Sequence, residues 1–403
     1  MSVPMHPIWL NASLIKLALA QSSQGLAGVM FSMGIVFTTT QNNDGRGLAI
    51  TLLTRTLPTL VCAFIGGVLA DRFSKKRISL MASAVSVITY IGFAVLTWEY
   101  GFSWQVQLFS LLTAFISALG APAVYSLLPA VVDHDYLVQA NGFVRTFRNI
   151  SYVSAPVLAG LLAAHYPAHI LFVVASVFGT TNIILLALIH LPPTFNTSKD
   201  KNHEESLIES MKTAPHIFAH YRWLLLGVIF WSITLALDSG AGDVILPLYA
   251  IPLSSKITWS YVSAALSIGY ITGSALSLFV KNSRYLIRLS FIFTALAAIR
   301  LCTIALTNNT WLWIASAFIA GIGFELGGVT WGSALQQRSP EKYLGRISSL
   351  DYAVSFGFIP FAYAGYALIP QQYYSSSLIL TTAIIGAMAL VFSLLMIRLE
   401  KTL

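Results

Sequence analysis

Long apolar stretches alternate with short polar segments through the whole chain. The hydrocarbon core of a bilayer, about 30 Å thick, needs about 20 mostly apolar residues for each helical span. Twelve stretches that meet this requirement can be read at about residues 13–40, 47–70, 77–98, 103–129, 142–165, 168–191, 222–248, 257–280, 286–307, 311–334, 347–369 and 374–397. The pattern therefore predicts an all-α membrane protein with twelve transmembrane helices.

One longer polar segment divides these stretches into two sets of six. Residues 192–220 carry seven charged side chains within 29 positions, far above the average of the chain. We therefore predict a six-helix bundle over residues 1–191, a cytoplasmic linker over 192–220 and a second six-helix bundle over 221–403.

The two predicted bundles also share a weak internal repeat. The segment Ser126–Leu137 aligns without gaps with Ser333–Leu344, 207 positions further on. Each segment joins the fourth and fifth apolar stretches of its own half. Two six-helix halves related by an axis along the membrane normal form a known transporter architecture, so the repeat predicts two pseudo-symmetric bundles.

Composition and charge support a membrane protein and argue against nucleic acid as a partner. Hydrophobic residues make up 56% of the chain and charged residues 9%, whereas soluble domains carry about 25% charged residues. The net charge of +8 is spread between apolar stretches and does not form one basic surface. Cys62 and Cys302 lie inside apolar stretches and are interpreted as packing residues, so we predict no metal site.

The distribution of basic residues predicts the orientation in the membrane. With the amino terminus in the cytoplasm, nineteen of the 23 Lys and Arg residues lie in inner loops or at inner helix ends. The other four are Arg46, Arg55, Lys256 and Arg300. Because positively charged loops stay on the cytoplasmic side, both termini are predicted to be cytoplasmic.

The most specific motif lies between the second and third apolar stretches, at Gly66–Arg77. Gly67 allows helices to approach closely at the membrane edge, and Asp71 can accept hydrogen bonds from the amino terminus of a facing helix. Arg72 and the basic residues that follow can anchor the loop to the cytoplasmic surface. The basic residues taken alone are equally typical of any positive-inside turn.

This run resembles the G-x-L-A-D-R-x-G-R-K signature of the major facilitator superfamily. Its glycine, leucine, alanine, aspartate and first arginine match at Gly67, Leu69, Ala70, Asp71 and Arg72, whereas Ser74 and Lys75 replace the second glycine and second arginine. The resemblance implies that Asp71 helps to latch a cytoplasmic gate. Asp351, near the inner end of the eleventh stretch, and Arg346 are expected to belong to the same gate.

Further segments resemble the branch of that family that contains macrolide-efflux and siderophore-export permeases. They are Leu128-Pro129, Tyr136–Gly142, Arg148-Asn149, Gln336–Arg338 and Leu344–Asp351. The fifth stretch is similar to an exporter motif with small residues at fixed spacing, in which Gly142, Pro156 and Gly160 are matched and Ser or Ala replaces other glycines. Generic close helix packing explains the same small residues equally well.

Polar groups inside the apolar stretches are the candidate site residues, because burying them in a membrane is costly. They are Lys16, Gln21, Gln24, Arg55, Asp238, Asp243, Arg300, Glu325 and Asp351. Glu325 lies among glycines and is the first candidate for proton exchange, with Asp238 the second. The alternative role of Glu325 is a structural partner of Arg300 or Arg55. Arg55 could instead bind an anionic substrate or neutralise Asp238.

Trp231, Phe324 and Trp331 are candidates for lining an apolar cavity, with core packing as the alternative.

We therefore expect a monomeric transporter in a bacterial inner membrane that exports an amphiphilic small molecule, drug-like or a siderophore. The sequence has no G-x-x-x-x-G-K-[ST] nucleotide-binding motif, so the expected energy source is a proton gradient without a cofactor. An importer of a nutrient or iron chelate with the same fold is the first alternative. A polytopic membrane enzyme is the second, although the inner loops hold too few acidic and histidine residues for a persuasive catalytic site.

Overall fold

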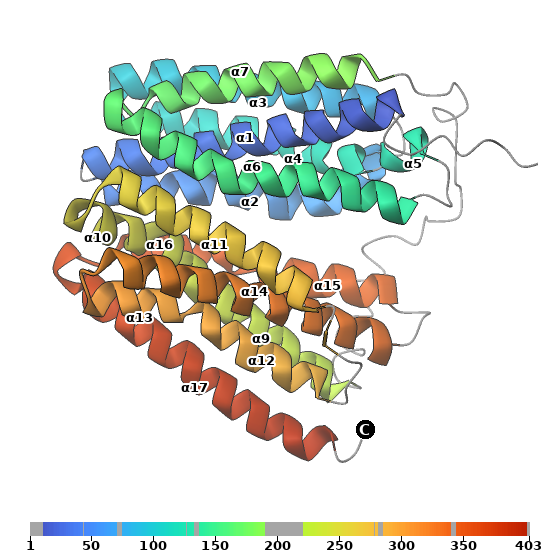
Figure 1. Ribbon diagram of the computed structural model, residues 1–403, viewed down its shortest axis with the longest axis vertical. Helices are drawn as coiled ribbons and strands as arrows, with labels where there is room; N and C mark the ends of the chain where they lie inside the picture. The colour runs from blue at the N-terminus through green and yellow to red at the C-terminus, as the bar shows by residue number, and fades with distance from the viewer. Residues whose placement is uncertain are drawn as a thin grey trace, which may run out of the picture. The chain divides into compact units, whose positions relative to one another are not determined.

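The protein is helical throughout the parts that the computed structural model describes (Figure 1). These are residues 11–42, 44–70, 75–125, 127–132, 137–189, 221–277, 279–280, 285–339 and 344–400. Asp71, Arg72 and the predicted linker 192–220 lie outside the described residues. The chain divides into two compact units, Met1–Thr38 with Thr54–Lys201 and Thr39–Leu53 with Asn202–Leu403. Each unit is described by itself.

The first unit is built from six long helices and one short one. They are α1 (Ala12–Gln41), α2 (Gly45–Ala70), α3 (Lys75–Tyr100), α4 (Trp104–Tyr125), the four-residue α5 (Leu128–Val131), α6 (Leu137–His165) and α7 (Ile170–Ala187). The last residues of α1 and the first turns of α2 group with the second unit. Helix α3 packs between α4 and α7.

Two lysines complete the end of α7. Lys76 Nζ donates to the carbonyl oxygens of Ala187 (2.8 Å) and Ile189 (2.6 Å), and Lys16 Nζ donates to that of Leu188 (3.1 Å). The last carbonyl groups of a helix have no partner within the helix, and cations satisfy both their hydrogen bonds and the negative end of the helix dipole. These contacts fix α7 against α1 and α3.

The second unit contains the helices of the second half of the chain, and three of its spans are interrupted. The elements are α9 (Arg222–Ser239), the π-helix η5 (Gly240–Ile245), α10 (Leu246–Leu253), α11 (Lys256–Ser277), α12 (Leu286–Ala297), α13 (Ile299–Leu306), α14 (Thr310–Arg338), α15 (Leu344–Gly357), α16 (Ile359–Ala367), η7 (Gln371–Tyr373) and α17 (Tyr374–Glu400). Interruptions separate α9 from α10, α12 from α13 and α15 from α16.

The expected fold class is confirmed. When each interrupted span is counted once and the short α5 and η7 are left out, the described residues form twelve long helical spans. By length and composition, six helices in these parts of the chain can cross a bilayer: Lys76–Tyr100, Ile170–Ala187, Arg222–Leu253, Leu286–Leu306, Thr310–Arg338 and Gln371–Ile397. Trp104–Ala118 and Ala353–Ala367 are shorter apolar helices.

Helix α14 lies between α11 and α12, and glycines permit the close packing on both sides (Figure 1). A Cβ atom added at Gly269 of α11 would lie 2.3 Å from the carbonyl oxygen of Phe318, and one added at Gly321 would lie 2.2 Å from that of Leu266. On the other side, a Cβ at Gly323 would lie 2.6 Å from the carbonyl oxygen of Phe293. Backbone-to-backbone packing of this kind is typical of membrane helices.

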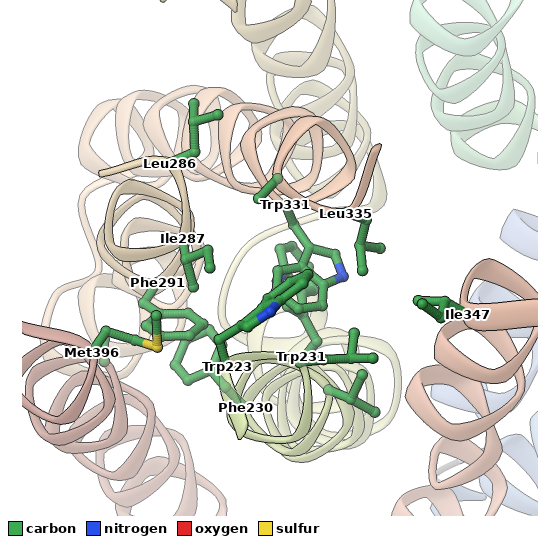
Figure 2. Packing of buried hydrophobic residues seen from close by; sticks show 14 of the residues in the cluster. Trp223, Phe230, Trp231, Leu286, Ile287, Phe291, Trp331, Leu335, Ile347 and Met396 are labelled. Carbon is green, nitrogen blue, oxygen red and sulfur yellow. The ribbon is translucent and has the colours of Figure 1, made fainter. Parts of the chain in front are cut away.

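Aromatic and aliphatic side chains fill the centre of the second unit (Figure 2). Phe230 of α9 and Phe291 of α12 are fully buried, with their ring centroids 4.3 Å apart. Trp231 and Trp331 belong to the same buried cluster, and each is 5% exposed. The cluster ties α9, α12, α14 and α17 together around one apolar centre.

Candidate functional site

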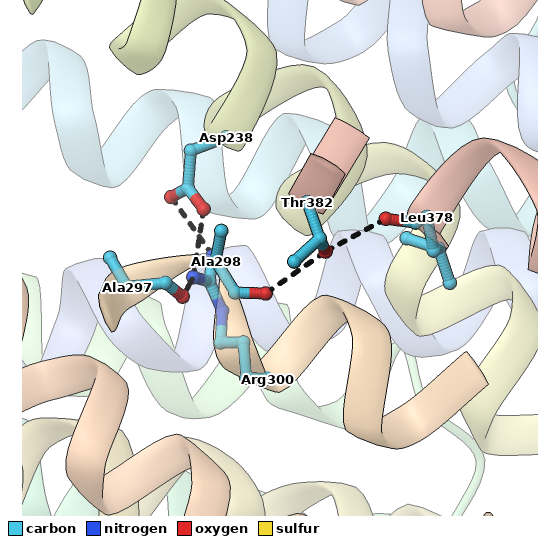
Figure 3. A network of polar contacts seen from close by, with 6 residues as sticks. All are labelled: Asp238, Ala297, Ala298, Arg300, Leu378 and Thr382. Carbon is cyan, nitrogen blue, oxygen red and sulfur yellow. Dashed lines mark hydrogen bonds and ion pairs between the residues drawn. The ribbon is translucent and has the colours of Figure 1, made fainter. Parts of the chain in front are cut away.

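A buried ion pair joins two interrupted spans of the second unit (Figure 3). Arg300 Nη1 donates to Asp238 Oδ1 at 2.8 Å, and Arg300 Nη2 donates to Asp238 Oδ2 at 3.0 Å. The two side chains are only 10% and 15% exposed. Two parallel charge-assisted bonds fix the geometry as well as the charge balance, so the pair holds α13 to the end of α9.

The interruption between α12 and α13 gives Arg300 a third bond. Arg300 Nη1 also donates to the carbonyl oxygen of Ala297 at 2.7 Å, where α12 ends. The carbonyl oxygen of Ala298 accepts from the Thr382 hydroxyl of α17 at 3.1 Å. The carbonyl oxygens at the helix break therefore accept hydrogen bonds from side chains at the site, as Figure 3 shows.

The π-helix η5 places a second aspartate beside this pair. Asp243 Oδ2 accepts a hydrogen bond of 2.8 Å from the Tyr363 hydroxyl of α16, and the Asp243 side chain remains exposed. A Cβ at the neighbouring Gly242 would lie 2.4 Å from Arg300 Nη2, so only glycine leaves room for the guanidinium group. π-Helical turns inside α-helices occur frequently at functional sites.

Glu325 reaches the same region from α14. It is half-buried, and a Cβ at Gly273 of α11 would lie 2.9 Å from Glu325 Cβ, so the two helices pack closely beside the carboxyl group. Tyr270, one turn earlier on α11, lies within electrostatic reach of Asp238, Asp243, Arg300 and Glu325. We refer to these five residues with Tyr363 as the polar cluster. It holds three carboxyl groups and one guanidinium group.

Asp351 lies in a separate polar group with Trp331. The indole nitrogen Nε1 of Trp331 donates to both carboxylate oxygens of Asp351, at 3.1 and 3.2 Å, and the Ser355 hydroxyl donates to Asp351 Oδ1 at 3.3 Å. A Cβ at Gly227 would lie 2.0 Å from the Trp331 ring, so this ring packs directly on the α9 backbone. Asp351 thereby connects α15 to α14.

The predicted cavity aromatics lie against protein in this structure. The indole nitrogen of Trp231 donates to the Ser290 hydroxyl at 3.1 Å, and that hydroxyl donates to the carbonyl oxygen of Gly327 at 2.9 Å. Phe324 contacts the rings of Trp231 and Tyr270, with centroid distances of 6.1 and 5.7 Å. Phe324 therefore connects the apolar centre to the polar cluster, and a cavity-lining role stays a prediction.

The first unit holds a polar group of its own, around Gln24 and Arg55. Gln24 Oε1 accepts from Asn182 Nδ2 of α7 at 3.0 Å, and the same amide nitrogen donates to the Ser83 hydroxyl at 2.9 Å. The guanidinium carbon of Arg55 lies 4.4 Å from the centroid of the Phe31 ring. Gln21 is half-buried on α1. The structure thus brings Gln24 into a network, while Asp238 and Arg300 meet in the other unit.

The other predicted residues fall into three groups. Gly67, Gly142 and Arg346 lie in helices, but nothing is described of their surroundings, and Asp71 and Arg72 are outside the described residues. Pro156 and Gly160 are buried in α6. At a neighbouring small position of that helix, the Ser151 hydroxyl lies 2.6 Å from the Ser22 hydroxyl of α1.

Three residues of these networks were missed by the sequence prediction: Asn182, Tyr270 and Tyr363. Asn182 carried a usable signal, since it is a polar residue in the middle of an apolar stretch. The tyrosines carried none, because tyrosine is common in membrane helices and only its neighbours reveal its role. Within the described ranges, no three His, Cys, Asp or Glu side chains converge closely enough to hold a metal ion.

Comparisons with known proteins agree with this architecture. The family model described as Major Facilitator Superfamily matches residues 17–362. Macrolide efflux protein A from Streptococcus pyogenes is 22% identical over 344 residues, which cover 82% of this chain and 82% of that protein. Enterobactin exporter EntS from Salmonella typhimurium is 30% identical over 161 residues, which cover 40% of this chain and 38% of that protein. The resemblance predicted from the motifs is confirmed.

Solved structures of transporters share the fold. Nucleoside transporter NupG aligns with a TM-score of 0.69 and 13% identity, covering 94% of this chain and 98% of that one. Peptide transporter POT in complex with sulfate aligns with a TM-score of 0.72 and 13% identity, covering 99% and 97%. At this identity the likeness shows the fold alone. Because the family match spans most of the chain, the protein is a multi-pass membrane transporter, not an enzyme, and belongs to the Major Facilitator Superfamily.

Proposed function

We propose that this transporter exports an amphiphilic organic compound across a bacterial inner membrane in exchange for protons. It works as a monomer with both termini in the cytoplasm and needs no cofactor. Export is supported by the names of the relatives, a macrolide efflux protein and an enterobactin exporter. The drug-like or siderophore character of the cargo is inferred from the same relatives.

The observation that supports proton coupling is the gathering of three carboxyl groups in the polar cluster. Asp238 forms the ion pair with Arg300, and the cluster contains two further carboxyl groups, on Asp243 and Glu325. An ionised carboxylate is costly inside a membrane, and proton uptake removes that cost. A cluster that holds three carboxyl groups inside a membrane protein is therefore suited to bind and release protons.

Gating is assigned to residues at the cytoplasmic ends of the helices. The family resemblance gives Asp71, with Gly67 and Arg72, the role of a latch, and we assign Arg346 and Asp351 to the same gate. The hydrogen bonds from Trp331 and Ser355 hold Asp351 in one orientation. A gate residue on α15 is thereby connected to α14, the helix that carries Glu325.

The direction of transport is tested with inside-out membrane vesicles. Their cytoplasmic face points outward, so an exporter moves its cargo into the vesicle when the interior is acidified. We expect a radiolabelled macrolide or enterobactin to accumulate in vesicles that contain the protein, and to leave when the gradient is collapsed. Loss of preloaded cargo on acidification, faster than in protein-free vesicles, would instead show that the protein is an importer.

Glu325→Gln is expected to lower proton-driven uptake to the level of vesicles without the protein. The amide keeps the size of the side chain but cannot exchange a proton. Glu99→Gln is the matched control, because Glu99 is exposed near the end of α3 and its replacement should leave uptake unchanged. Wild-type uptake by a folded Glu325→Gln variant would assign Glu325 a structural role.

A further inference from the structure

Arg55 is a cation in the interior of the first unit. It lies in the middle of α2, is half-buried, and stacks on the Phe31 ring of α1 at 4.4 Å. A cation–π contact uses the face of the guanidinium plane. The five N–H donors point outward from its edge, so they remain available for an acceptor in that plane. The stacking therefore fixes the guanidinium group without using its hydrogen-bond donors.

The helices of the first unit supply no negative charge to balance Arg55. In α1, α2, α3, α4, α6 and α7 the only Asp or Glu is Glu99, the residue before the last of α3. Glu99 comes nine positions after Tyr90, which places it about 13 Å further along the helix at 1.5 Å per residue. None of the described residues forms an ion pair with Arg55. A cation without a counter-charge inside a membrane protein is costly and points to a ligand that supplies one.

A buried hydrogen-bond network holds the groups beside Arg55 in place. The Tyr90 hydroxyl lies within electrostatic reach of Arg55 and close to the side chains of Gln24 and Ser86. Asn182, 3% exposed, then joins Gln24 to Ser83. The network runs across α1, α3 and α7 and consists of neutral groups only. It can orient Tyr90 beside Arg55, but it cannot neutralise the arginine.

The surface on which Arg55 rests is aromatic. The Phe31 ring contacts the rings of Tyr90, Phe93 and Phe172, with centroid distances of 5.0, 4.8 and 5.4 Å. These rings are buried and pack against each other, so the Phe31 platform is rigid. A guanidinium group fixed on a rigid platform suits a ligand with an anionic group that accepts charge-assisted hydrogen bonds.

We propose that Arg55 binds the anionic group of the transported compound, and that the cargo is an organic acid. Arg55 forms the charge-assisted bonds to the carboxylate, and Tyr90 is a positioning residue beside it. The inference rests on the proposed function in taking the cargo to be an amphiphilic organic compound. It deepens that function by assigning the cargo a negative charge and by placing its binding residue in the first unit.

Binding in detergent tests this site without any transport. The probes are 2-naphthoate and 2-naphthamide, which share a ring system and differ in the carboxylate. Ligand that binds only the folded state raises the melting temperature. We expect the acid, but not the amide, to raise the melting temperature of the purified wild-type protein in proportion to the logarithm of its concentration.

Three variants test whether the stabilisation by 2-naphthoate depends on Arg55. Arg55→Gln should lose the stabilisation by 2-naphthoate, and Arg55→Lys, which keeps the charge but not the planar fork, should retain a weaker one. Arg46→Gln is the matched control, because Arg46 is exposed at the start of the same helix and its replacement should change nothing. The melting temperatures without ligand show whether each variant is folded, and Arg55→Lys carries the test if Arg55→Gln is not.

The outcomes separate this proposal from the proposed export. Equal stabilisation by acid and amide, an unchanged response in Arg55→Gln, or no response of the wild type to 2-naphthoate overturns the anion site. Each of these readings is independent of a proton gradient. Failure of proton-driven export in vesicles, with binding of the acid intact, would leave the anion site standing and contradict only the direction or the coupling.

Discussion

Arg300→Met is expected to destabilise the protein by about 3–5 kcal/mol, the usual cost of removing one partner of a buried ion pair. The carboxylate of Asp238 would lose both of its guanidinium bonds while staying 15% exposed. The carbonyl oxygen of Ala297 would also lose its donor at the end of α12. The measurement is the free energy of unfolding in detergent by denaturant titration, compared with the wild type.

The double variant Arg300→Met with Asp238→Leu is the informative control. Apolar residues of similar size remove both charges, and such replacements of buried ion pairs are often close to neutral in stability. We therefore expect the double variant to recover most of the loss. A double variant as unstable as Arg300→Met alone would mean that the guanidinium group acts mainly through Ala297 and the packing at Gly242, and not through its charge pair.

Gly269→Val is expected to prevent α11 from packing on α14. Its first added carbon would lie 2.3 Å from the carbonyl oxygen of Phe318 and 2.9 Å from the Cα of Gly321, so backbone would have to move. We expect a loss of at least about 3 kcal/mol, at the upper end of the range for overpacked sites. Size-exclusion chromatography and thermal unfolding in detergent measure the folded fraction.

Gly328→Val on α14 provides the comparison for Gly269→Val. Gly328 is exposed, and an added Cβ there would meet nothing within 4 Å. The same chemical change should therefore leave the stability close to that of the wild type. Equal stability of the two variants would contradict the close contact between α11 and α14, and with it the placement of Glu325 beside Gly273.

The positions of the membrane helices could be predicted from the sequence because burial in lipid selects for length and apolar composition. The stretch predicted at 311–334 corresponds to α14 (Thr310–Arg338), and 13–40 corresponds to α1 (Ala12–Gln41). The break at Ala298 could not be predicted, since hydropathy does not change there. At the break at Ala298, the side chains of Arg300 and Thr382 donate to the carbonyl oxygens of Ala297 and Ala298. The break between α15 and α16 does carry a signal, because Pro360 in the first turn of α16 cannot donate a backbone hydrogen bond.

The candidate site could be predicted only as a set of residues. Asp238, Arg300 and Glu325 were identified because each is a charged group in an apolar stretch, but the sequence offered Arg55 and Arg300 equally as partners. Which charges meet depends on helix rotation. The π-helix turns Asp243 toward Tyr363, and Gly242 makes room for Arg300. Neither effect leaves a periodic signal in the sequence.

The π-helix at Gly240–Ile245 also has a consequence for the evolution of this span. A turn with i→i+5 bonds holds one residue more than a regular turn, which is the local result of a single inserted codon. Deleting one residue here would rotate all of α10 against α9 by about a quarter turn, at 3.6 residues per turn. Two related proteins that differ by one residue in length at this place would thus present different side chains of α10 to the same neighbouring helices.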